Sequence, residues 1–530
     1  MMATKKRNFL PLKDLSLEEL VPKDNFYRRL ERTVDLSFVR ELVRDRYASG
    51  GRPSVDPVVF FKLQLVLFFE DLRSERQLME VAADRISIRW YLGYDLTEPL
   101  PDHSSLTRIR QRYGLEVFRC FFEEIVELCI EAGLVWGKEL FFDSTKVEAD
   151  ASVDSLVPRF AVVEAHLERL FEEDEEVRDA QEEGTSQSPP IAGSYALPTA
   201  DDQELRTKNA AKSDLISREG RQDRAFKSGY RKRTSDSRAS RTDADATPMT
   251  RSKGTTRLGY QTHYVVDGGK ARIILGVLVT PSEVTENRPM LDLLWRTVFR
   301  WGLRAHHVTG DARYGTRENV AAIEKAAIKA YLAIPNFDFR NTGLFGPGHF
   351  RYDAQGNHYV CPAGQTLRFQ NKDHRNRRKR YRVSPKICNA CTLKTKCTTS
   401  DHGRVLYRPF DEDFYERVRR YRGTEPYEKA LRKRAVWVEP LFAEAKEWHG
   451  MRRFRLRRLR KVNIEALLIA SGQNVKRLLA FGGHRPKKLA QAAALRPPAA
   501  TDYKISRSRE HRAERSWPPR RSFFNTLGHY

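Results

Sequence analysis

Residues 139–146, ELFFDSTK, combine a short apolar run with a carboxylate and small polar residues. The run is rich in β-forming residues, so we expect a buried strand that ends at Asp143. A carboxylate in that position has two interpretations. It is either a solvated strand end or helix cap, or a metal ligand or catalytic group at the carboxyl end of a strand, where open α/β sheets place their sites. The local sequence leaves both open.

The charge balance of the chain points to a polyanionic partner. Across 530 residues, 95 lysines and arginines against 70 acids give a formal net charge of +25, and the isoelectric point is near 9.8. Nucleic acid is the commonest partner of so basic a protein, and a ribosome-like or simply soluble basic protein is the alternative. A chain of this length is expected to form about two to four domains.

No segment of the sequence predicts export or membrane insertion. The N-terminus is basic, but no apolar stretch follows it, so it does not resemble a signal peptide. The most apolar run, residues 58–69, is too short to cross a bilayer and includes Lys62 and Gln64. Six cysteines in so long a chain do not suit a disulfide scaffold and fit a reducing compartment. We therefore expect a cytoplasmic protein.

Residues 15–135 are predicted to be almost wholly helical. Apolar residues recur at three- and four-residue spacing after Ser54, which is a candidate helix cap. A later segment, residues 106–113, carries the candidate DNA-binding residues Arg108 and Arg110. Short helices joined by tight turns, the last of them basic, suit a helix-turn-helix DNA reader. An ordinary helical bundle with a solvated basic face explains the pattern equally well.

Two further stretches lack the apolar periodicity of a core. Residues 160–183 are acidic and helix-like, and residues 184–255 are rich in Ser, Thr, Gly, Pro, Lys and Arg. We expect an insertion here that is disordered, or a mobile arm, in the absence of a partner. The basic, proline-rich residues 481–530 are likewise predicted to be disordered.

Beyond residue 260 the pattern predicts regular structure again. Two strands, 260–267 and 271–279, are expected to form a hairpin that turns after Asp267. Alternating helices and strands then predict a mixed α/β sheet. These later elements are expected at residues 287–300, 306–311, 317–328 and 331–334. Asp311 ends one of these strands and is followed by Ala-Arg-Tyr-Gly, so it is a second carboxylate in the same kind of position as Asp143.

A second interruption, residues 336–430, is rich in cysteine. Four of the six cysteines of the chain lie here: Cys361, Cys388, Cys391 and Cys397. Tetrahedral zinc takes four soft ligands, and small β-hairpin knuckles supply thiolates at about this spacing. We interpret the four as ligands of a structural Zn²⁺ ion without an open coordination position. Because the spacing is looser than a strict double C-x2-C pattern, four unliganded thiols are the alternative.

The last ordered segment is predicted to begin near Arg434, with a helix that carries Glu439 and Lys446 two turns apart on one face. Pro440 is tolerated because it lies near the expected helix start. A run of seven basic residues without an acid follows. Because a solvated face normally mixes charge signs, we interpret this run as contacting a phosphate backbone. Its candidate DNA-binding residues are Arg452, Arg453, Arg455, Arg457 and Arg458.

In their order and contexts, these motifs resemble the DDE transposases of bacterial insertion sequences. The resemblance rests on Asp143 in FFDSTK, Asp311 in VTGDARYG, and Glu439 with Lys446 beyond it. It also includes the helical N-terminal region, the GYQTHY strand, the Cys-bearing insertion and residues 474–478. Each motif alone is weak, but together they cover most of the chain and their order is specific.

The resemblance implies a fold and a division into domains. The fold is α/β, an RNase H-like mixed sheet flanked by helices, with an all-α N-terminal domain and a small Cys-rich insertion. The implied segments are a helical domain at 1–135, a split catalytic domain at 136–159, 256–335 and 431–480, insertions at 160–255 and 336–430, and a tail at 481–530.

The resemblance also implies a reaction. Asp143, Asp311 and Glu439 would bind two Mg²⁺ ions, for which Mn²⁺ can substitute, with Asp143 bridging both. Two metals suit an in-line phosphoryl displacement because they activate a water or 3′-hydroxyl and stabilise the leaving oxygen, and hard oxygen ligands suit Mg²⁺. Lys446 would hold a phosphate of the element's end. The protein would bind double-stranded DNA at terminal inverted repeats, cleave and transfer strands as a homodimer, and act on the bacterial nucleoid.

The sequence departs from the family pattern just before the third acid. The family often places Tyr and then Arg ahead of the Glu, with three residues between Arg and Glu. Here Ala435 occupies the Arg position, and Arg434 lies one residue earlier. Glu444 and Glu447 are rivals for the third acid, and Asp267 is a rival for the first.

Three functional classes remain compatible with the sequence. The first, which we predict, is an active transposase. The second is a catalytically decayed or repurposed sequence-specific DNA-binding protein that keeps the fold. The third is a Mg²⁺-dependent nuclease of the same fold that hydrolyses DNA without joining strands.

Overall fold

The computed structural model describes residues 16–47, 54–158, 238–250, 256–334 and 343–482. Most of the predicted disordered insertion and nearly all of the predicted tail lie outside the described residues. Residues 238–250 belong to that predicted insertion, yet they form two short strands, β3 and β4. The expectation of disorder is therefore wrong for these residues, because β4 pairs with the start of β5 and gains its hydrogen bonds there.

The N-terminal region is helical, as predicted. Its helices are α1 (Leu17–Leu20), α2 (Phe26–Thr33), α3 (Phe38–Val43), α4 (Pro57–Phe69), α5 (Glu75–Asp84), α6 (Ile86–Leu92) and α7 (His103–Glu131). Asp56, and not Ser54, caps α4, and its carboxylate accepts the N–H of Val58 at 2.8 Å. Pro57 takes the first helical position, so the cap must precede it directly. Gly114 interrupts α7 with a φ of 65°, directly after the predicted helical segment 106–113.

A mixed sheet forms the centre of the molecule, in agreement with the predicted fold class. Its strands are β1 (Glu139–Glu148), β4 (Thr247–Thr250), β5 (Thr256–Asp267), β6 (Ile274–Pro281), β7 (His307–Gly310) and β8 (Lys329–Leu332). β1 lies between β5, to which it is antiparallel, and β7, to which it is parallel. β8 continues the parallel side, and β6 pairs antiparallel with β5. A separate pair, β2 (Leu156–Pro158) and β3 (Arg238–Ser240), completes this part.

β1 is longer than predicted, so Asp143 lies inside the strand and not at its end. Antiparallel pairing with β5 continues as far as Glu148, whereas parallel pairing with β7 stops at Phe141. From Asp143 onward, β1 therefore has no pairing partner in β7. On the side that faces β7, the carboxylate is placed as it would be at a strand end.

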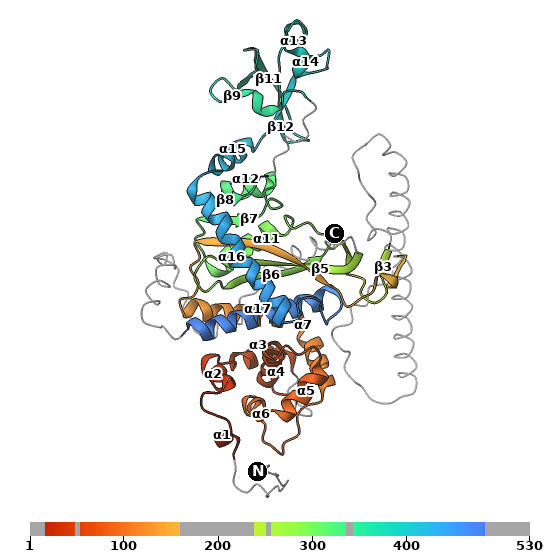
Figure 1. The fold of residues 1–530 in the computed structure, drawn as a ribbon, viewed down its shortest axis with the longest axis vertical. Coiled ribbons are helices and arrows are strands. Elements are labelled where there is room, and N and C mark those ends of the chain that lie inside the picture. The colour runs from red at the N-terminus through yellow and green to blue at the C-terminus, as the bar shows by residue number, and fades with distance from the viewer. Residues whose placement is uncertain (1–15, 48–53, 159–237, 251–255, 335–342, 483–530) are drawn as a thin grey trace, which may run out of the picture.

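α16 (Glu425–Trp448) crosses the sheet (Figure 1) and begins nine residues before the predicted start near Arg434. Pro440 is consequently inside the helix. A proline has no N–H, so the carbonyl of Val436 loses its helical donor. Arg272 replaces it, with Nη1 donating to that oxygen at 3.4 Å. The remaining helices around the sheet are α11 (Met290–Trp301), α12 (Arg317–Lys325), α15 (Glu412–Tyr421) and α17 (Leu459–Phe481).

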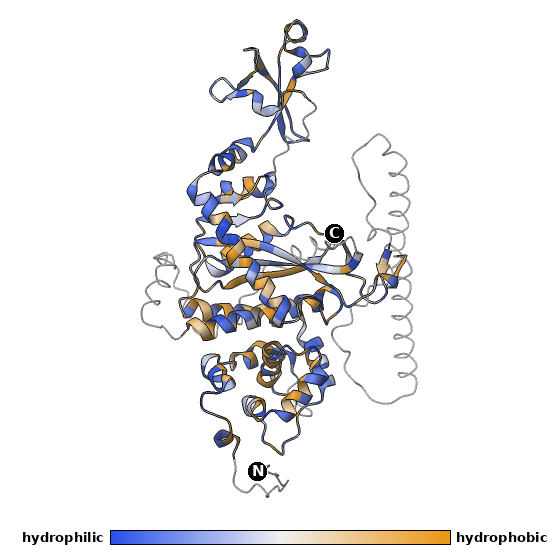
Figure 2. Ribbon diagram, viewed as in Figure 1, coloured by the Kyte–Doolittle hydropathy of each residue, from blue (hydrophilic) through white to orange (hydrophobic). Residues whose placement is uncertain are grey.

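α17 joins the N-terminal helices to the sheet. It packs against α7, α4 and β6. Gly472 allows the close approach of Phe68 from α4, because a Cβ at this position would lie 2.4 Å from the ring. Phe68 also stacks on His449, with 3.7 Å between ring centroids. One continuous hydrophobic cluster thus includes side chains of the N-terminal helices and of the sheet, and apolar residues gather along α7, α17 and the strands (Figure 2).

Residues 343–411 form a small β-rich insertion at the end of the molecule furthest from the N-terminal helices (Figure 1). Its elements are β9 (Arg351–Asp353), β10 (His358–Val360), β11 (Thr366–Asp373), β12 (Arg378–Arg382), α13 (Pro385–Asn389), α14 (Lys394–Cys397) and β13 (Val405–Pro409). The strands form an antiparallel sheet in the order β13-β12-β11-β10-β9. Leu367, Tyr381 and Leu406 belong to a core of its own. α15 then leads back to α12, where Tyr415 donates to the Gly315 carbonyl at 3.2 Å.

Among the helices of the described residues, none has the length and apolar character needed to cross a membrane.

Candidate active site

β1 and β7 bring two of the predicted acids together. The parallel register pairs Phe141 with Thr309, and Asp311 follows the last residue of β7. Continued by two residues, the same register sets Asp143 opposite Asp311. Neighbouring strands lie about 4.8 Å apart, so the two carboxylates are close enough to interact.

Asp143 sits in an environment that disfavours its negative charge. The residue is 9% exposed, and burial is the main cause that raises the pKa of its carboxyl to about 6. Arg434 and the N–H of Ser144, which donates at 2.9 Å, partly offset this effect. The charges of Asp311 and Glu286 raise the pKa of Asp143 further. A bound cation would remove this electrostatic cost.

α16 carries the third predicted acid to the same place. Arg434 Nη1 donates to Asp143 Oδ2 at 2.7 Å, and its Nη2 lies 3.6 Å from Glu439 Oε1. The guanidinium thus lies between two of the predicted acids. Glu439 itself is 59% exposed at its side chain and faces solvent. Although Arg434 is shifted by one residue from the family pattern, it still supplies an arginine to the site.

Glu286 is a fourth carboxylate near the site, and the sequence analysis missed it. It lies in the turn between β6 and α11 and is 7% exposed. Arg313 Nη1 donates to Glu286 Oε1 at 2.5 Å, and the N–H of Arg313 donates to Asp311 Oδ1 at 2.8 Å. An acid in a turn between a strand and a helix has no distinctive pattern, so only the three-dimensional structure brings Glu286 near Asp143.

Asp267, the rival for the first acid, has a local structural role. Its carboxylate accepts the backbone N–H groups of Trp136, Gly137 and Gly269 at 2.7 to 2.9 Å. It is fully buried in the hairpin turn after β5. Two of the donors belong to the segment between α7 and β1 and the third to the hairpin, so this carboxylate ties the two segments together.

The rivals for the third acid are also engaged elsewhere. Burial alone would raise the pKa of Glu444, but hydrogen bonds and charges from His449, Arg477 and Lys476 outweigh it and hold that pKa well below its usual range. This cluster fastens α16 to α17. Glu447 lies at the surface and pairs with Arg452.

The donors at the site suit a divalent cation, but they are not arranged as a ligand set. In the part of the chain that the structure describes, no group of three or more His, Cys, Asp or Glu side chains is placed to hold a metal ion. Carboxylates are the hard oxygen donors that Mg²⁺ prefers. Burial raises the pKa of Asp143, so a positive charge close to it would stabilise its ionised form. Arg434 supplies that charge to Asp143 and Glu439 in this structure.

Lys446 lies beside β1, one strand position further along the same face. Its Nζ donates to Thr145 Oγ1 at 2.5 Å. Because alternate strand residues share a face, Thr145 and Asp143 point to the same side of the sheet. Lys446 therefore stands next to the acids, at the position from which a phosphate near them could be contacted.

The basic run, which is predicted to contact a phosphate backbone, makes many contacts within the protein itself. Its backbone joins the sheet, because the Glu148 carbonyl accepts the N–H of Phe454 at 2.9 Å.

The side chains of the basic run form ion pairs. Arg453 and Arg457 pair with Asp150, at 2.7 and 2.8 Å. Arg452 pairs with Glu447, and Arg455 is mostly buried at 3.8 Å from Glu465. The run contains no acid of its own, but folding supplies acids from three other segments. Arg458 begins α17, and its N–H donates to Asp243 at 3.0 Å.

The two arginines predicted to read DNA from the N-terminal helices have different surroundings. Arg108 is exposed, and its Nη2 donates to Ser104 at 3.1 Å. Arg110 is 5% exposed and forms an ion pair with Glu75, which joins α7 to α5. The assignment of Arg110 to DNA contact is therefore wrong, because its guanidinium is used inside the helical region.

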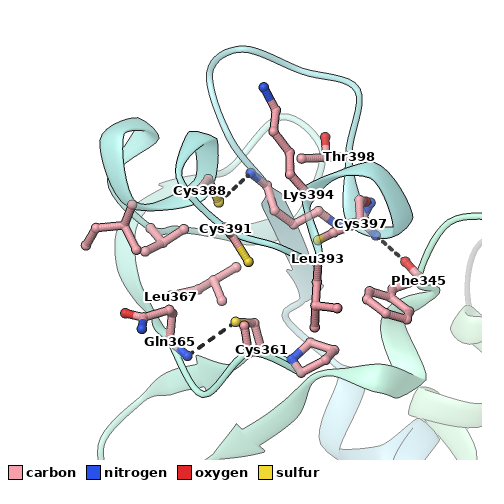
Figure 3. A pocket seen from close by; sticks show the side chains of 15 residues that line it. Phe345, Cys361, Gln365, Leu367, Cys388, Cys391, Leu393, Lys394, Cys397 and Thr398 are labelled. Atoms are coloured by element: carbon pink, nitrogen blue, oxygen red, sulfur yellow. Dashed lines mark hydrogen bonds between the residues drawn. The ribbon is translucent and has the colours of Figure 1, made fainter.

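The four cysteines of the insertion line one small cavity (Figure 3). Cys361 Sγ accepts the N–H of Gln365 at 3.3 Å, and Cys388 Sγ accepts that of Arg404 at 3.4 Å. The sulfurs are nevertheless free thiols and are not spaced as a ligand group in this structure.

Two family models match the chain at separate places. A model described as Transposase domain (DUF772) matches residues 15–112, and one described as Transposase DDE domain matches residues 360–479. The first covers most of the N-terminal helices. The second includes Glu439 and Lys446, but neither Asp143 nor Asp311. Comparison with curated proteins and with solved structures gives no match.

Proposed function

We propose that this chain, parts of which match two transposase family models, is a DDE transposase of an insertion sequence that cleaves and joins DNA strands at a site formed by Asp143, Asp311 and Glu439. The observation that carries the proposal is the convergence of these acids. The register of β1 and β7 sets Asp143 opposite Asp311, and Arg434 links Asp143 to Glu439. We further propose that the sheet is RNase H-like, which its strand order β6-β5-β1-β7-β8 supports.

The proposed reaction is phosphoryl transfer with divalent metal ions. Asp143 would contact two Mg²⁺ ions, and Asp311 and Glu439 would contact one each. When bound, the ions activate a water or a 3′-hydroxyl and stabilise the leaving oxygen. Arg434 pairs with Asp143 and lies near Glu439, so its guanidinium would compete with such ions for these two carboxylates. Lys446 is placed beside Asp143 to hold a phosphate of the strand being cut.

The remaining parts of the proposal concern DNA and assembly. The exposed side of the N-terminal helices, with Arg108, would contribute to binding of the terminal inverted repeats. Joining two element ends requires two active sites, so we propose a homodimer in the synaptic complex, acting on DNA in the bacterial cytoplasm. The basic run would add contacts through those arginines that remain accessible, such as Arg453 and Arg457, each about half exposed.

We also propose that the insertion holds a structural zinc ion through Cys361, Cys388, Cys391 and Cys397. The support is that all four thiols border one cavity (Figure 3) and that two of them accept backbone N–H groups. Four soft ligands without an open position suit a structural site. The sulfurs would have to draw closer together than they are in this structure.

A strand-transfer assay with the element's own ends tests the catalytic assignment. We expect Asp143→Asn, Asp311→Ala and Glu439→Gln each to lower cleavage and joining by about a thousandfold, which corresponds to about 4 kcal/mol of transition-state stabilisation. Glu447→Gln is the matched control, because Glu447 is an exposed acid on the same helix. It should keep nearly full activity.

The same assay separates the alternatives. Full joining by Asp311→Ala would exclude the proposed site. Cleavage without joining by the unaltered protein would favour a nuclease. Binding of the ends without any cleavage would favour a protein that keeps the fold but has lost catalysis.

A further inference from the structure

One face of the insertion's sheet carries a concentration of arginines. Residues 366–382, which span β11, β12 and their turn, contain eight Lys or Arg residues and one acid. The ribbon of these strands is predominantly hydrophilic (Figure 2). Successive strand residues point to opposite faces, so the register determines which of the basic residues share a face.

The ladder places arginines from neighbouring strands side by side. Arg368 on β11 pairs with Arg382 on β12, and Arg380 on β12 pairs with Tyr407 on β13. Arg368 also pairs with His358 on β10, which puts Arg351 of β9 on the same side. The opposite face carries Leu367, Tyr381 and Leu406 and forms the insertion's core. We call the first face the arginine face; its basic and aromatic residues are Arg351, Arg368, Arg378, Arg380, Arg382 and Tyr407, and the ladder also places the acids Asp353 and Asp373 on it.

Few of these charges are neutralised within the molecule. Arg378 pairs with Asp373 at 2.9 Å, and Arg382 donates to the His402 carbonyl at 2.8 Å. For Arg351, Arg368 and Arg380, no ion pair with an acid is found among the described residues. Like charges on adjacent strands repel one another and destabilise a sheet. The arrangement is therefore costly unless an anionic partner covers it.

Tyr407 gives the face a feature that a simply solvated charged surface does not need. Its side chain is on the edge strand β13, beside the arginines of β12, and is 46% exposed. Arg378 lies over the ring, with its guanidinium carbon 3.8 Å from the ring centroid. This contact holds the arginine upright on the sheet. Tyrosine and arginine side chains both contact phosphate oxygens in protein–DNA interfaces.

We propose that the arginine face binds the phosphate backbone of duplex DNA, at a distance from the proposed active site. The proposal rests on the action of this family on DNA, but not on which acids are catalytic. Phosphate contacts position a protein on DNA without reading its sequence. The insertion stands beyond β8 and α12, at the opposite end of the molecule from the N-terminal helices (Figure 1). DNA held here would therefore lie at the far end of the molecule from DNA held by those helices.

The first test measures binding of the full chain to a mixed-sequence DNA duplex by fluorescence anisotropy over a range of salt concentrations. The variant combines Arg351→Gln, Arg368→Gln and Arg380→Gln. We expect affinity to fall at least about tenfold near 0.1 M salt, and the slope of log K against log salt to decrease by about two to three, since each phosphate contact contributes about 0.9. Thermal unfolding that matches the unaltered chain shows that the variant is folded.

The control removes three charges from a different surface. Arg304→Gln, Lys325→Gln and Lys329→Gln change exposed residues near the start of β7 and β8, at the opposite end of these strands from Asp311. This triple variant should keep both affinity and salt slope close to those of the unaltered chain. Equal losses in the two triple variants would overturn the proposal, because they would reflect net charge alone.

A second test does not depend on the stability of the variants. A photo-crosslinking amino acid in place of Tyr407 should form a covalent adduct with the duplex, whereas the same amino acid in place of the exposed Phe299 on α11 should not. Absence of the adduct at 407 would overturn the proposal, as would a crosslink from 407 to the chain's own acidic residues 160–183. Neither test requires strand cleavage, so both can succeed or fail independently of the proposed catalytic site.

Discussion

Asp143 has the electrostatic character of a functional carboxylate. It is buried, it stands beside Asp311, and an arginine from a distant helix offsets only part of the cost of its charge. Glu444 differs, because its hydrogen bonds and neighbouring charges outweigh its burial. Burial also raises the pKa of the structural residue Asp267, so it is the position of Asp143 beside Asp311 and Arg434 that supports a functional role.

The raised pKa of Asp143 predicts how stability depends on pH. The folded protein binds the proton of this carboxyl more tightly than the unfolded chain does, so stability falls as pH rises from about 4 to about 6 and is then constant. Asp143→Asn removes the charge while keeping the shape. Without divalent metal, we expect the variant to be more stable than the unaltered protein by about 1–3 kcal/mol at pH 7.5, with little difference at pH 4. Urea unfolding across this range measures it.

Glu447→Gln is the control for this experiment, because it changes an exposed carboxylate on α16. It should alter the free energy of unfolding by less than about 0.5 kcal/mol. A stability gain in Asp143→Asn that grows as the pH falls would contradict the assigned environment of Asp143.

At the level of elements, α17 covers the edge of the sheet at β6. β6 pairs with β5 on one side, and two asparagines of α17 meet its backbone. Asn474 accepts from Ile274 N and donates to Ile274 O, both at 2.9 Å. Asn463 makes the equivalent pair with Val279 at 2.8 and 3.0 Å. The side-chain amides thus take the place of a neighbouring strand and protect the edge.

Asn474→Ala should be strongly destabilising. It leaves a buried N–H and a buried C=O of Ile274 without partners, and it removes two hydrogen bonds. We expect the free energy of unfolding to decrease by about 2–4 kcal/mol, measured by urea denaturation at pH 7. Asn371→Ala, at an exposed asparagine of β11, should change it by less than about 0.5 kcal/mol. A loss below about 1 kcal/mol for Asn474→Ala would show that the edge is not held in this way.

On the scale of the whole molecule, the described residues contain one large region of packing and a separate small one in the insertion. The N-terminal helices and the central sheet share one hydrophobic cluster, in which Phe68 and Gly472 meet. The insertion has its own small core around Leu367 and Tyr381. Five buried side chains make a modest core, and small domains of this kind often depend on a metal ion for stability.

This separation predicts what removal of zinc would do. The purified protein should contain about one zinc ion per chain, measured by elemental analysis. Chelation, or Cys391→Ser, should increase hydrogen exchange in residues 343–411 while β1, β5 and α17 remain protected. Cys120→Ser is the control, because Cys120 lies on α7 outside the insertion, and it should retain zinc. A metal-free native protein, or a Cys391→Ser variant with full zinc content, would count against the proposed site.

Much of the fold could be predicted from local patterns. Apolar periodicity and turn residues indicated the helices of the N-terminal region, the hairpin at Asp267 and the alternation that ends at β8. The errors arose where long-range contacts decide. The strand after Asp143 continues because β5 supplies partners on one side, and α16 passes through Pro440 because Arg272 bonds to the carbonyl that the proline leaves unpaired.

The sequence by itself determined the residue types and their contexts: acids that follow β-forming runs, an acid and a lysine two turns apart, and a family resemblance that two family models match. Only the tertiary structure decided the surroundings of those residues. The register of two parallel strands sets Asp143 beside Asp311, and a helix from far along the chain brings Arg434 and Glu439 to them. The position of Glu286 and the ion pair of Arg110 could not be foreseen, because burial and charge pairing depend on neighbours that are remote in sequence.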